Sequence, residues 1–165
     1  MSTIAAIATA SGKGGVAIIR ISGKSPLEIA EKMFIPVGKK KVSEFEPYRM
    51  YPGTIDAGGF SDYGLCVYFK GPASYTGEDI VEFQCHGGES VARGILKQTF
   101  RLGAKPAGRG EFTKRAFLNG KLSLSSAEGL IDMINGESVA AVKSGYSLYR
   151  EKLFEKVTAL QDKIT

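Results

Sequence analysis

The residues best suited to chemistry gather in the segment 71–86, where turn-forming residues lead into an alternating run that ends at the only histidine. In an extended strand, residues two apart share a face, so Glu82 and His86 lie together on the polar face of this run. A buried carboxylate without a partner is costly. The structural interpretation of Glu82 is therefore a salt bridge with Arg20 or Arg115, and the functional interpretation is a contact with a ligand.

The other reactive side chains near this run give weaker signals. Glu78 and Asp79 adjoin in sequence, so an extended chain points them apart and disfavours an acid dyad. Cys66 and Cys85 lie in segments typical of buried strands, and we expect reduced core thiols, with a disulfide as the minor alternative. A single histidine, His86, excludes most metal sites and catalytic triads, which need several ligands or a base beside a nucleophile.

Two glycine-containing turns, residues 11–15 and 23–25, do not form a phosphate-binding loop. The P-loop motif requires a glycine five positions before Gly23, and that position is Ile18. Phosphate-binding loops also open a helix, whereas the turn 11–15 precedes a predicted strand. We therefore expect no GTP or ATP binding by this chain alone.

Composition bounds the class of protein. The 165 residues suffice for one domain and the start of another, and 43% apolar with 24% charged residues is typical of globular proteins. The sequence has neither a membrane-spanning apolar run nor a secretory signal, so we expect a cytoplasmic protein without membrane contact. The net charge of +5 suits a polyanion such as RNA or a polyglutamylated small molecule. Six basic residues cluster near one acid, Glu111: Arg101, Lys105, Arg109, Lys114, Arg115 and Lys121.

The elements that must position these residues follow from periodicity. Strands are predicted at 3–9 and 16–22, joined by the turn 11–15, and again at 49–55, 64–69 and 80–85. A helix is predicted with Ser25 as its N-cap and Pro26 as its first residue. Its apolar stripe is Leu27, Ala30 and Phe34, and it ends before Pro36. Further helices are predicted at 89–102 and 111–119, the second ended by Gly120.

After Lys121 the pattern becomes helical throughout. Ser125 and Glu128 fit a capping box at the start of one helix, and a second helix begins near Gly136. Its apolar positions recur every three or four residues, which indicates a truncated bundle or a helix completed by a partner. They are Val139, Val142, Tyr146, Tyr149, Leu153, Val157, Leu160 and Ile164.

Four segments match a known family in order: 3–9 continued by 12–23, then 71–82, 85–88 and 110–122. With them, the chain resembles the front end of the MnmE (TrmE) family. The resemblance implies an α+β fold, a mixed sheet with helices similar to the tetrahydrofolate-binding domain of the glycine-cleavage aminomethyltransferase. It implies a folate-binding and dimerisation domain over residues 1–121 and the start of a helical domain over 122–165.

The family implies a tRNA modification GTPase that works with MnmG on the wobble uridine and forms homodimers. GTP, Mg²⁺ and K⁺ belong to a G domain that has no counterpart in this sequence. We therefore expect this part of the protein to bind rather than to catalyse.

The resemblance also implies the ligand contacts. Arg20, Glu82 and Lys121 would bind a reduced folate, either 5-formyl- or 5,10-methylene-tetrahydrofolate. A pterin presents a ring N–H and an amino group side by side, two donors that one carboxylate can accept. The cations would meet carbonyl, formyl or glutamate oxygens. Secondary candidates are Gly14, Gly15, His86, Arg115 and Asn119.

Departures from the family pattern leave alternatives open. Arg109 replaces a proline before Gly110, and Ser123 replaces an acid after Leu122, which loosens a turn and removes a candidate cap. A stand-alone folate-dependent one-carbon transferase is the first alternative. A basic RNA-binding adaptor that uses residues 101–121 is the second.

Overall fold

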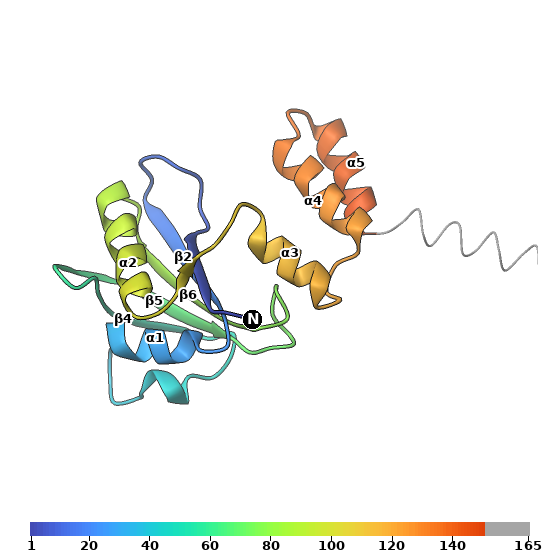
Figure 1. Ribbon diagram of the computed structural model, residues 1–165. Coiled ribbons are helices and arrows are strands. Elements are labelled where there is room, and N and C mark those ends of the chain that lie inside the picture. Colours follow the sequence, from blue (N-terminus) through green and yellow to red (C-terminus); the bar gives the residue numbers. More distant parts are fainter. Residues whose placement is uncertain (151–165) are drawn as a thin grey trace, which may run out of the picture. The chain divides into compact units, whose positions relative to one another are not determined.

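The computed structural model describes residues 1–150 and divides the chain into two compact units. The first unit comprises Met1–Phe112, and the second begins at Thr113. Figure 1 shows the helices and strands of both units.

The first unit is built on one mixed seven-stranded sheet in the order β3-β4-β5-β6-β2-β1-β7. All neighbouring strands are antiparallel except the parallel pair β1 and β7. Both edge strands are very short, and each ends in a proline. The predicted α+β class is thus confirmed. The strands are β1 (Ile4–Ile7), β2 (Val16–Gly23), β3 (Phe34–Pro36), β4 (Met50–Asp56), β5 (Ser61–Phe69), β6 (Asp79–His86) and β7 (Lys105–Pro106).

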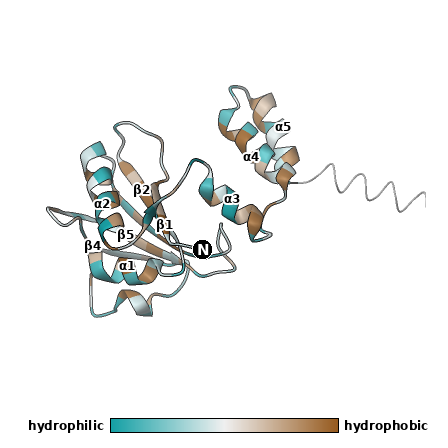
Figure 2. Cartoon of the chain, viewed as in Figure 1, coloured by the Kyte–Doolittle hydropathy of each residue, from teal (hydrophilic) through white to brown (hydrophobic). Residues whose placement is uncertain are grey.

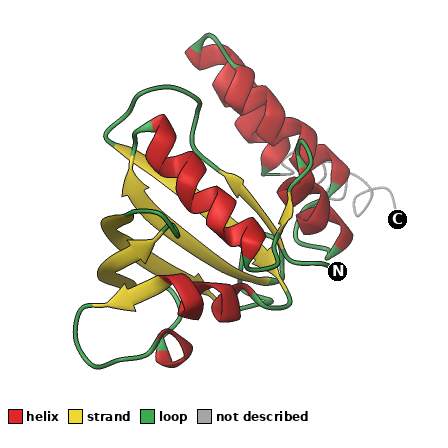
Figure 3. Ribbon diagram, turned by 60° about the vertical axis from the view of Figure 1, so that its left-hand side comes forward, coloured by secondary structure: helices red, strands yellow, loops and turns green. Residues whose placement is uncertain are grey.

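Helices α1 (Pro26–Met33) and α2 (Glu89–Arg101) lie on the same face of the sheet (Figures 1 and 3). Helix α1 contributes Ile29, Ala30 and Met33 to the core and α2 contributes Ala92 and Ile95, while α2 carries hydrophilic residues as well (Figure 2). A short 3-10 helix, η1 (Val42–Glu44), adds Val42 to the same core. This helix-covered face therefore contains the hydrophobic core.

Strand alternation separates the core from the second face of the sheet. On β2, Ile19 and Ile21 are fully buried in the core, whereas Arg20 points to the opposite face. On β6, Phe83 joins the core and its neighbour Glu82 faces the other way. The predicted alternation along β6 is confirmed, because Val81, Phe83 and Cys85 belong to the core, whereas Glu82 lies on the other face, which also carries apolar residues such as Ile80.

The first helix differs from its prediction in two details. Pro26 does occupy the first turn, but the Ser25 side chain makes no capping hydrogen bond. Phe34 belongs to β3 rather than to the helix, where its ring stacks on Phe83 and meets Phe45 edge to face. The aromatic cluster stabilises an extended Phe34, so the helix ends at Met33.

The second unit contains the helical hairpin α4 (Leu124–Asn135) and α5 (Val139–Tyr149), preceded by α3 (Glu111–Leu118), which begins in the first unit. At the end of α3, Gly120 adopts φ 67°. The amide of Gly120 donates to the Phe117 carbonyl, and the amide of Lys121 donates to that of Ala116. This pattern is a glycine-terminated helix cap, as the sequence predicted.

The start of α4 lies earlier than predicted. Ser123, rather than Ser125, is the N-cap, and its hydroxyl accepts a hydrogen bond from the Ser126 amide at 3.0 Å. Serine and aspartate cap helices about equally well, so Ser123 performs the capping that the family's acid would provide. The loss of a cap expected from this departure does not occur.

Helices α4 and α5 approach closely through glycine. A Cβ atom on Gly145 would lie 2.8 Å from the Met133 amide nitrogen and 2.9 Å from the Gly129 carbonyl oxygen. The Ser126 hydroxyl also donates to the Tyr149 carbonyl at 2.9 Å. The predicted stripe of this helix is described as far as Tyr149, and Leu153, Val157, Leu160 and Ile164 lie outside the described residues.

Gly145→Ala is expected to destabilise the hairpin by about 1–3 kcal/mol, because the added methyl group meets backbone that cannot move aside. Hydrogen exchange of the α4 and α5 amides measures this loss. The matched control is Gly59→Ala, where a Cβ meets nothing within 4 Å. Equal protection in both variants would contradict the close approach of the helices.

Candidate ligand site on the second sheet face

An ion pair is the centre of the candidate site. Antiparallel pairing of β2 and β6 sets Arg20 directly opposite Glu82. The Arg20 Nε donates to Glu82 Oε1 at 2.6 Å, with the side chains 26% and 11% exposed. Of the two salt-bridge partners considered for Glu82, the structure places Arg20 there. The ion pair is therefore partly covered by the protein and still in contact with solvent.

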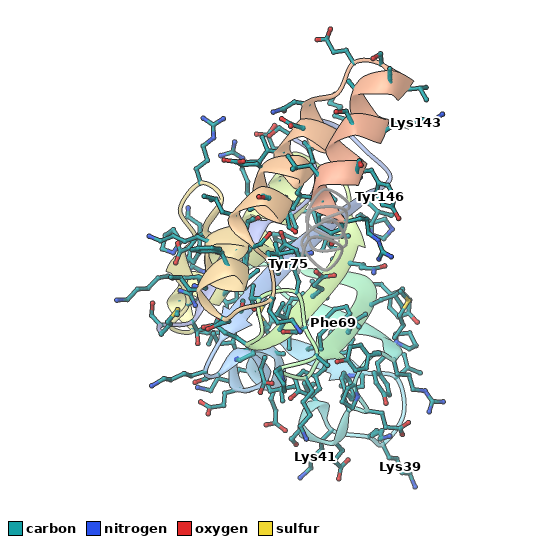
Figure 4. All side chains as sticks on the ribbon, turned by 90° about the vertical axis from the view of Figure 1, so that its right-hand side faces the viewer. Lys39, Lys41, Phe69, Tyr75, Lys143 and Tyr146 are labelled. Atoms are coloured by element: carbon teal, nitrogen blue, oxygen red, sulfur yellow. The ribbon has the colours of Figure 1, made fainter. Side chains whose placement is uncertain are left out.

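Two aromatic rings flank the guanidinium of Arg20. Its Cζ lies 5.4 Å from the ring centroid of Tyr75 and 5.5 Å from that of Phe112. Tyr75 is in the β5–β6 loop (labelled in Figure 4), and Phe112 is in the first turn of α3. Both distances fall within the range of cation–π attraction. Sequence reasoning missed both rings as site residues, because contacts between a loop and a distant helix leave no local pattern.

Several hydrogen bonds hold the β5–β6 loop, which carries Tyr75, in place. The Ser22 hydroxyl on β2 lies 2.8 Å from the Thr76 hydroxyl and donates to Glu78 at 2.9 Å. The Gly71 amide donates to Asp79 at 2.8 Å. Glu78 and Asp79 thus have different partners, which confirms that they do not form a dyad.

Tyr48 also contacts the β5–β6 loop. Its hydroxyl donates to the carbonyls of Lys70 and Ala73, and its ring meets Phe69 edge to face. Tyr48 has φ 64°, a left-handed conformation that is unfavourable for a residue other than glycine. The contacts with the loop offset this cost, so the loop position is determined by tertiary packing.

The structure does not bring the other predicted residues of the first unit to this pair. His86 lies four residues beyond Glu82 on β6, roughly 13 Å along the strand. Its Nδ1 is 2.6 Å from Asp62 Oδ1, and its amide donates to the other carboxylate oxygen at 2.9 Å. The amide of Gly14 donates to the Gly87 carbonyl, and the amide of Gly87 donates to that of Gly15, so these glycines serve backbone pairing beyond the end of the strand.

Lys121, Arg115 and Asn119 belong to the second unit. Lys121 follows the cap of α3 and is exposed, whereas Arg115 and Asn119 have interactions within the folded chain. Their predicted roles as ligand contacts stay predictions. The basic residues noted in the sequence are likewise divided, with Arg101, Lys105 and Arg109 in the first unit.

A cavity of about 520 Å³ lies away from the ion pair, between the β1–β2 loop and α2. Its lining includes Gly14, Lys13 and Arg93, but neither Arg20 nor Glu82. Arg93 is already paired with Glu89 at 2.8 Å. The arrangement of a carboxylate, a cation and two rings around Arg20 is chemically more specific than this cavity, so we place the candidate site at Arg20 and Glu82.

Both cysteines are free and buried, as predicted. Burial raises the pKa of the Cys66 thiol well above its ordinary value and the pKa of the Cys85 thiol to about 11. Burial also raises the pKa of Tyr68 to about 12, with Asp79 as the second cause. These three groups therefore stay protonated at neutral pH.

Among the described residues, no cluster of three or more potential metal ligands occurs.

Because only the thiolate reacts, both thiols should react with Ellman's reagent at pH 8 at least roughly 100-fold more slowly in the folded than in the guanidinium-unfolded chain. The rate for Cys85 should rise about tenfold per pH unit, since the thiolate fraction grows in that proportion below a pKa of about 11. Thiol titration against pH measures both effects. Similar rates in the folded and unfolded chain would show that the thiols are accessible.

Fold and site together define a mixed α+β sheet domain followed by helices, with a partly covered ion pair on the sheet face opposite α1 and α2. The chain belongs to the family described as the GTP-binding protein TrmE N-terminus, whose sequence model matches residues 3–121. Within residues 1–150 no helix is both long and apolar enough to cross a bilayer.

Similar proteins align with this chain over most of its length. The tRNA modification GTPase MnmE of Clostridioides difficile (strain 630) is 42% identical over 164 residues, which cover 99% of this chain and 36% of the relative. The protein of the same name from a Nitratiruptor species is 49% identical over 144 residues, 86% of this chain and 31% of the relative. The chain therefore spans about a third of the length of these relatives.

Proposed function

We propose that this chain binds a reduced folate, 5-formyl- or 5,10-methylene-tetrahydrofolate, through Arg20 and Glu82, and serves a tRNA-modifying assembly as a binding module. The observation that carries the proposal is the Arg20–Glu82 pair flanked by Tyr75 and Phe112. A carboxylate beside aromatic rings suits a flat heterocycle with adjacent N–H donors. Lys121 is the third proposed contact.

The family membership supports the wider setting. The relatives are named tRNA modification GTPases, so we propose that the chain acts with tRNA and MnmG in the cytoplasm. GTP hydrolysis is assigned to parts of such a protein beyond this chain. We also propose that the sheet domain shares its architecture with the folate-binding domain of the glycine-cleavage aminomethyltransferase.

Self-association through the second sheet face completes the proposal. Val16, Met50 and Tyr63 lie on that face and are 58%, 56% and 58% exposed. Exposed large apolar side chains on one sheet face suit an interface with another protein. A second copy of the chain would cover them. A single monomeric species in analytical ultracentrifugation at micromolar concentration would contradict this part of the proposal.

Isothermal titration calorimetry of the chain with 5-formyltetrahydrofolate tests the ligand. Saturable binding by the folded chain is expected, and no heat with folded protein would refute the folate assignment. A parallel titration with tRNA separates the adaptor alternative. Tight tRNA binding with a steep salt dependence, and no response to folate, would favour a basic RNA-binding adaptor.

A further inference from the structure

Helix α2 carries a row of cations on its solvent-facing side. Arg93, Lys97 and Arg101 are all exposed and follow one another at intervals of four residues. Four residues of an α-helix rise about 6 Å and make little more than one turn, so the three side chains leave the same side of the helix one after another. Successive phosphates of an RNA strand are a similar distance apart. The row is therefore suited to contact several phosphates of one strand.

Acidic side chains do not neutralise this row. Between Glu89 and Glu111 the sequence contains no other acid. Glu89 does pair with Arg93 at 2.8 Å, but both side chains are largely exposed, and an ion pair of this kind contributes little. Helix α1, in contrast, carries both acids and a base, as solvated helices commonly do. The charge on α2 is consequently available to an anionic partner.

A groove on α2 adjoins the row. Its volume is about 520 Å³, and its lining consists of Ser90, Arg93, Gly94, Leu96, Lys97 and Phe100. Two of the cations thus stand beside the hydrocarbon of Leu96 and Phe100. Proteins that hold single strands of nucleic acid combine cations for the phosphates with apolar and aromatic surface for the bases. Positive charge alone would suit any polyanion, whereas the groove favours one that also carries flat rings.

This surface is separate from the Arg20–Glu82 pair. Helix α2 covers the core face of the sheet (Figure 3), whereas Arg20 and Glu82 lie on the other face. The self-association proposed above uses that other face as well, so α2 stays accessible. At the N-terminal end of α2, Lys13 of the β1–β2 loop lines the same cavity as Arg93, which extends the positive surface toward that loop.

We propose that Arg93, Lys97, Arg101 and the adjoining groove bind an RNA strand, with the cations on its phosphates and an unpaired base in the groove. This inference rests on the proposed role in tRNA modification for the choice of RNA, and it does not depend on the folate. The chain then has two binding surfaces on opposite faces of its sheet. One takes a small ligand, and the other takes RNA.

Removal of the charges on α2 tests the proposal. A triple variant with Arg93→Gln, Lys97→Gln and Arg101→Gln should bind an unmodified tRNA transcript at least about tenfold more weakly than the wild type in fluorescence anisotropy. The slope of log affinity against log salt concentration should fall by about two to three, because each phosphate contact contributes about 0.7–0.9. Unchanged affinity and slope would overturn the α2 surface.

The matched control removes three exposed cations outside α2. A variant with Lys32→Gln, Lys39→Gln and Lys41→Gln changes the net charge by the same amount. It should weaken tRNA binding by less than about threefold, because salt screens charges that do not contact the RNA. Equal losses in the two triple variants would show that net charge alone attracts the RNA, and would also overturn the α2 surface.

Competition against bound tRNA distinguishes RNA from an acidic protein. Polyglutamate carries negative charges without rings, so it should displace the tRNA at least about tenfold less well than a single-stranded oligouridylate of equal charge, as expected when one stacked base is missing. Equal competition by the two polymers would assign the surface to an acidic protein and overturn the choice of RNA.

Folate binding serves as the independent readout. The α2 triple variant should bind 5-formyltetrahydrofolate with wild-type affinity in calorimetry, because Arg20 and Glu82 lie on the other face of the sheet. If the wild type bound tRNA through α2 but did not bind the folate, the folate assignment would fail and the α2 surface would stand. If the wild type bound the folate but no tRNA, the α2 surface would fail and the folate assignment would stand.

Discussion

Glu82→Ala is expected to lower the affinity for 5-formyltetrahydrofolate by at least about 100-fold. The carboxylate would accept two hydrogen bonds from the pterin, and loss of charged hydrogen bonds worth about 3 kcal/mol together corresponds to that factor. Glu82→Gln should fall between the wild type and Glu82→Ala, because its amide accepts one donor but faces the other with its own N–H groups. Isothermal titration calorimetry measures all three affinities.

Loss of binding must be separated from loss of folding. Removal of Glu82 leaves Arg20, whose side chain is only 26% exposed, without its carboxylate, at a cost of about 1–3 kcal/mol in the free energy of unfolding. Urea unfolding of each variant reports that cost. Glu28→Gln, an exposed acid on α1, should change neither quantity. Wild-type affinity in folded Glu82→Ala would eliminate Glu82 as the pterin contact.

Phe83→Ala is expected to produce the largest loss of stability, about 3–5 kcal/mol. Phe83 is fully buried in the centre of the core, and its ring stacks on Phe34 with 5.8 Å between centroids. Domains of this size are stable by only about 5–15 kcal/mol, so the variant should approach the limit of folding. It should also disorder the site, because Glu82 precedes Phe83 on the same strand.

Urea unfolding followed by circular dichroism is the suitable measurement, since the chain has no tryptophan. Phe60→Ala is the control, because its side chain is 42% exposed and should cost about 1 kcal/mol. Phe83→Leu should retain much of the packing and fall between them. An equal unfolding midpoint for Phe83→Ala and Phe60→Ala would show that the ring contributes little to the core.

Local periodicity explains why much of the fold could be predicted. The alternation around Glu82 identified the two faces of β6, and the glycine turn before Val16 identified the hairpin. Helix ends were less certain, because Ser123 and Ser125 are both suitable caps and only packing decides between them. Phe34 was assigned to a helix because its aromatic partners are far away in sequence.

The site could be predicted only in part, for the same reason. The sequence suggested that Glu82 needs a partner but could not choose between Arg20 and Arg115, since the pairing register spans 62 residues. The proximity of Tyr75 and Phe112 could not be predicted, because no local sequence pattern relates a residue in the β5–β6 loop to one in the first turn of α3. Family resemblance supplied Arg20 and Glu82, but not the rings that surround them.

The edges of the sheet bear on how the chain behaves at high concentration. Edge strands with unpaired backbone groups invite other chains to add strands, which leads to aggregation. Here β3 and β7 are only three and two residues long, and Pro36 and Pro106 each lack the N–H that an added strand would need. The short edge strands that end in proline therefore oppose the addition of further strands at both ends of the sheet.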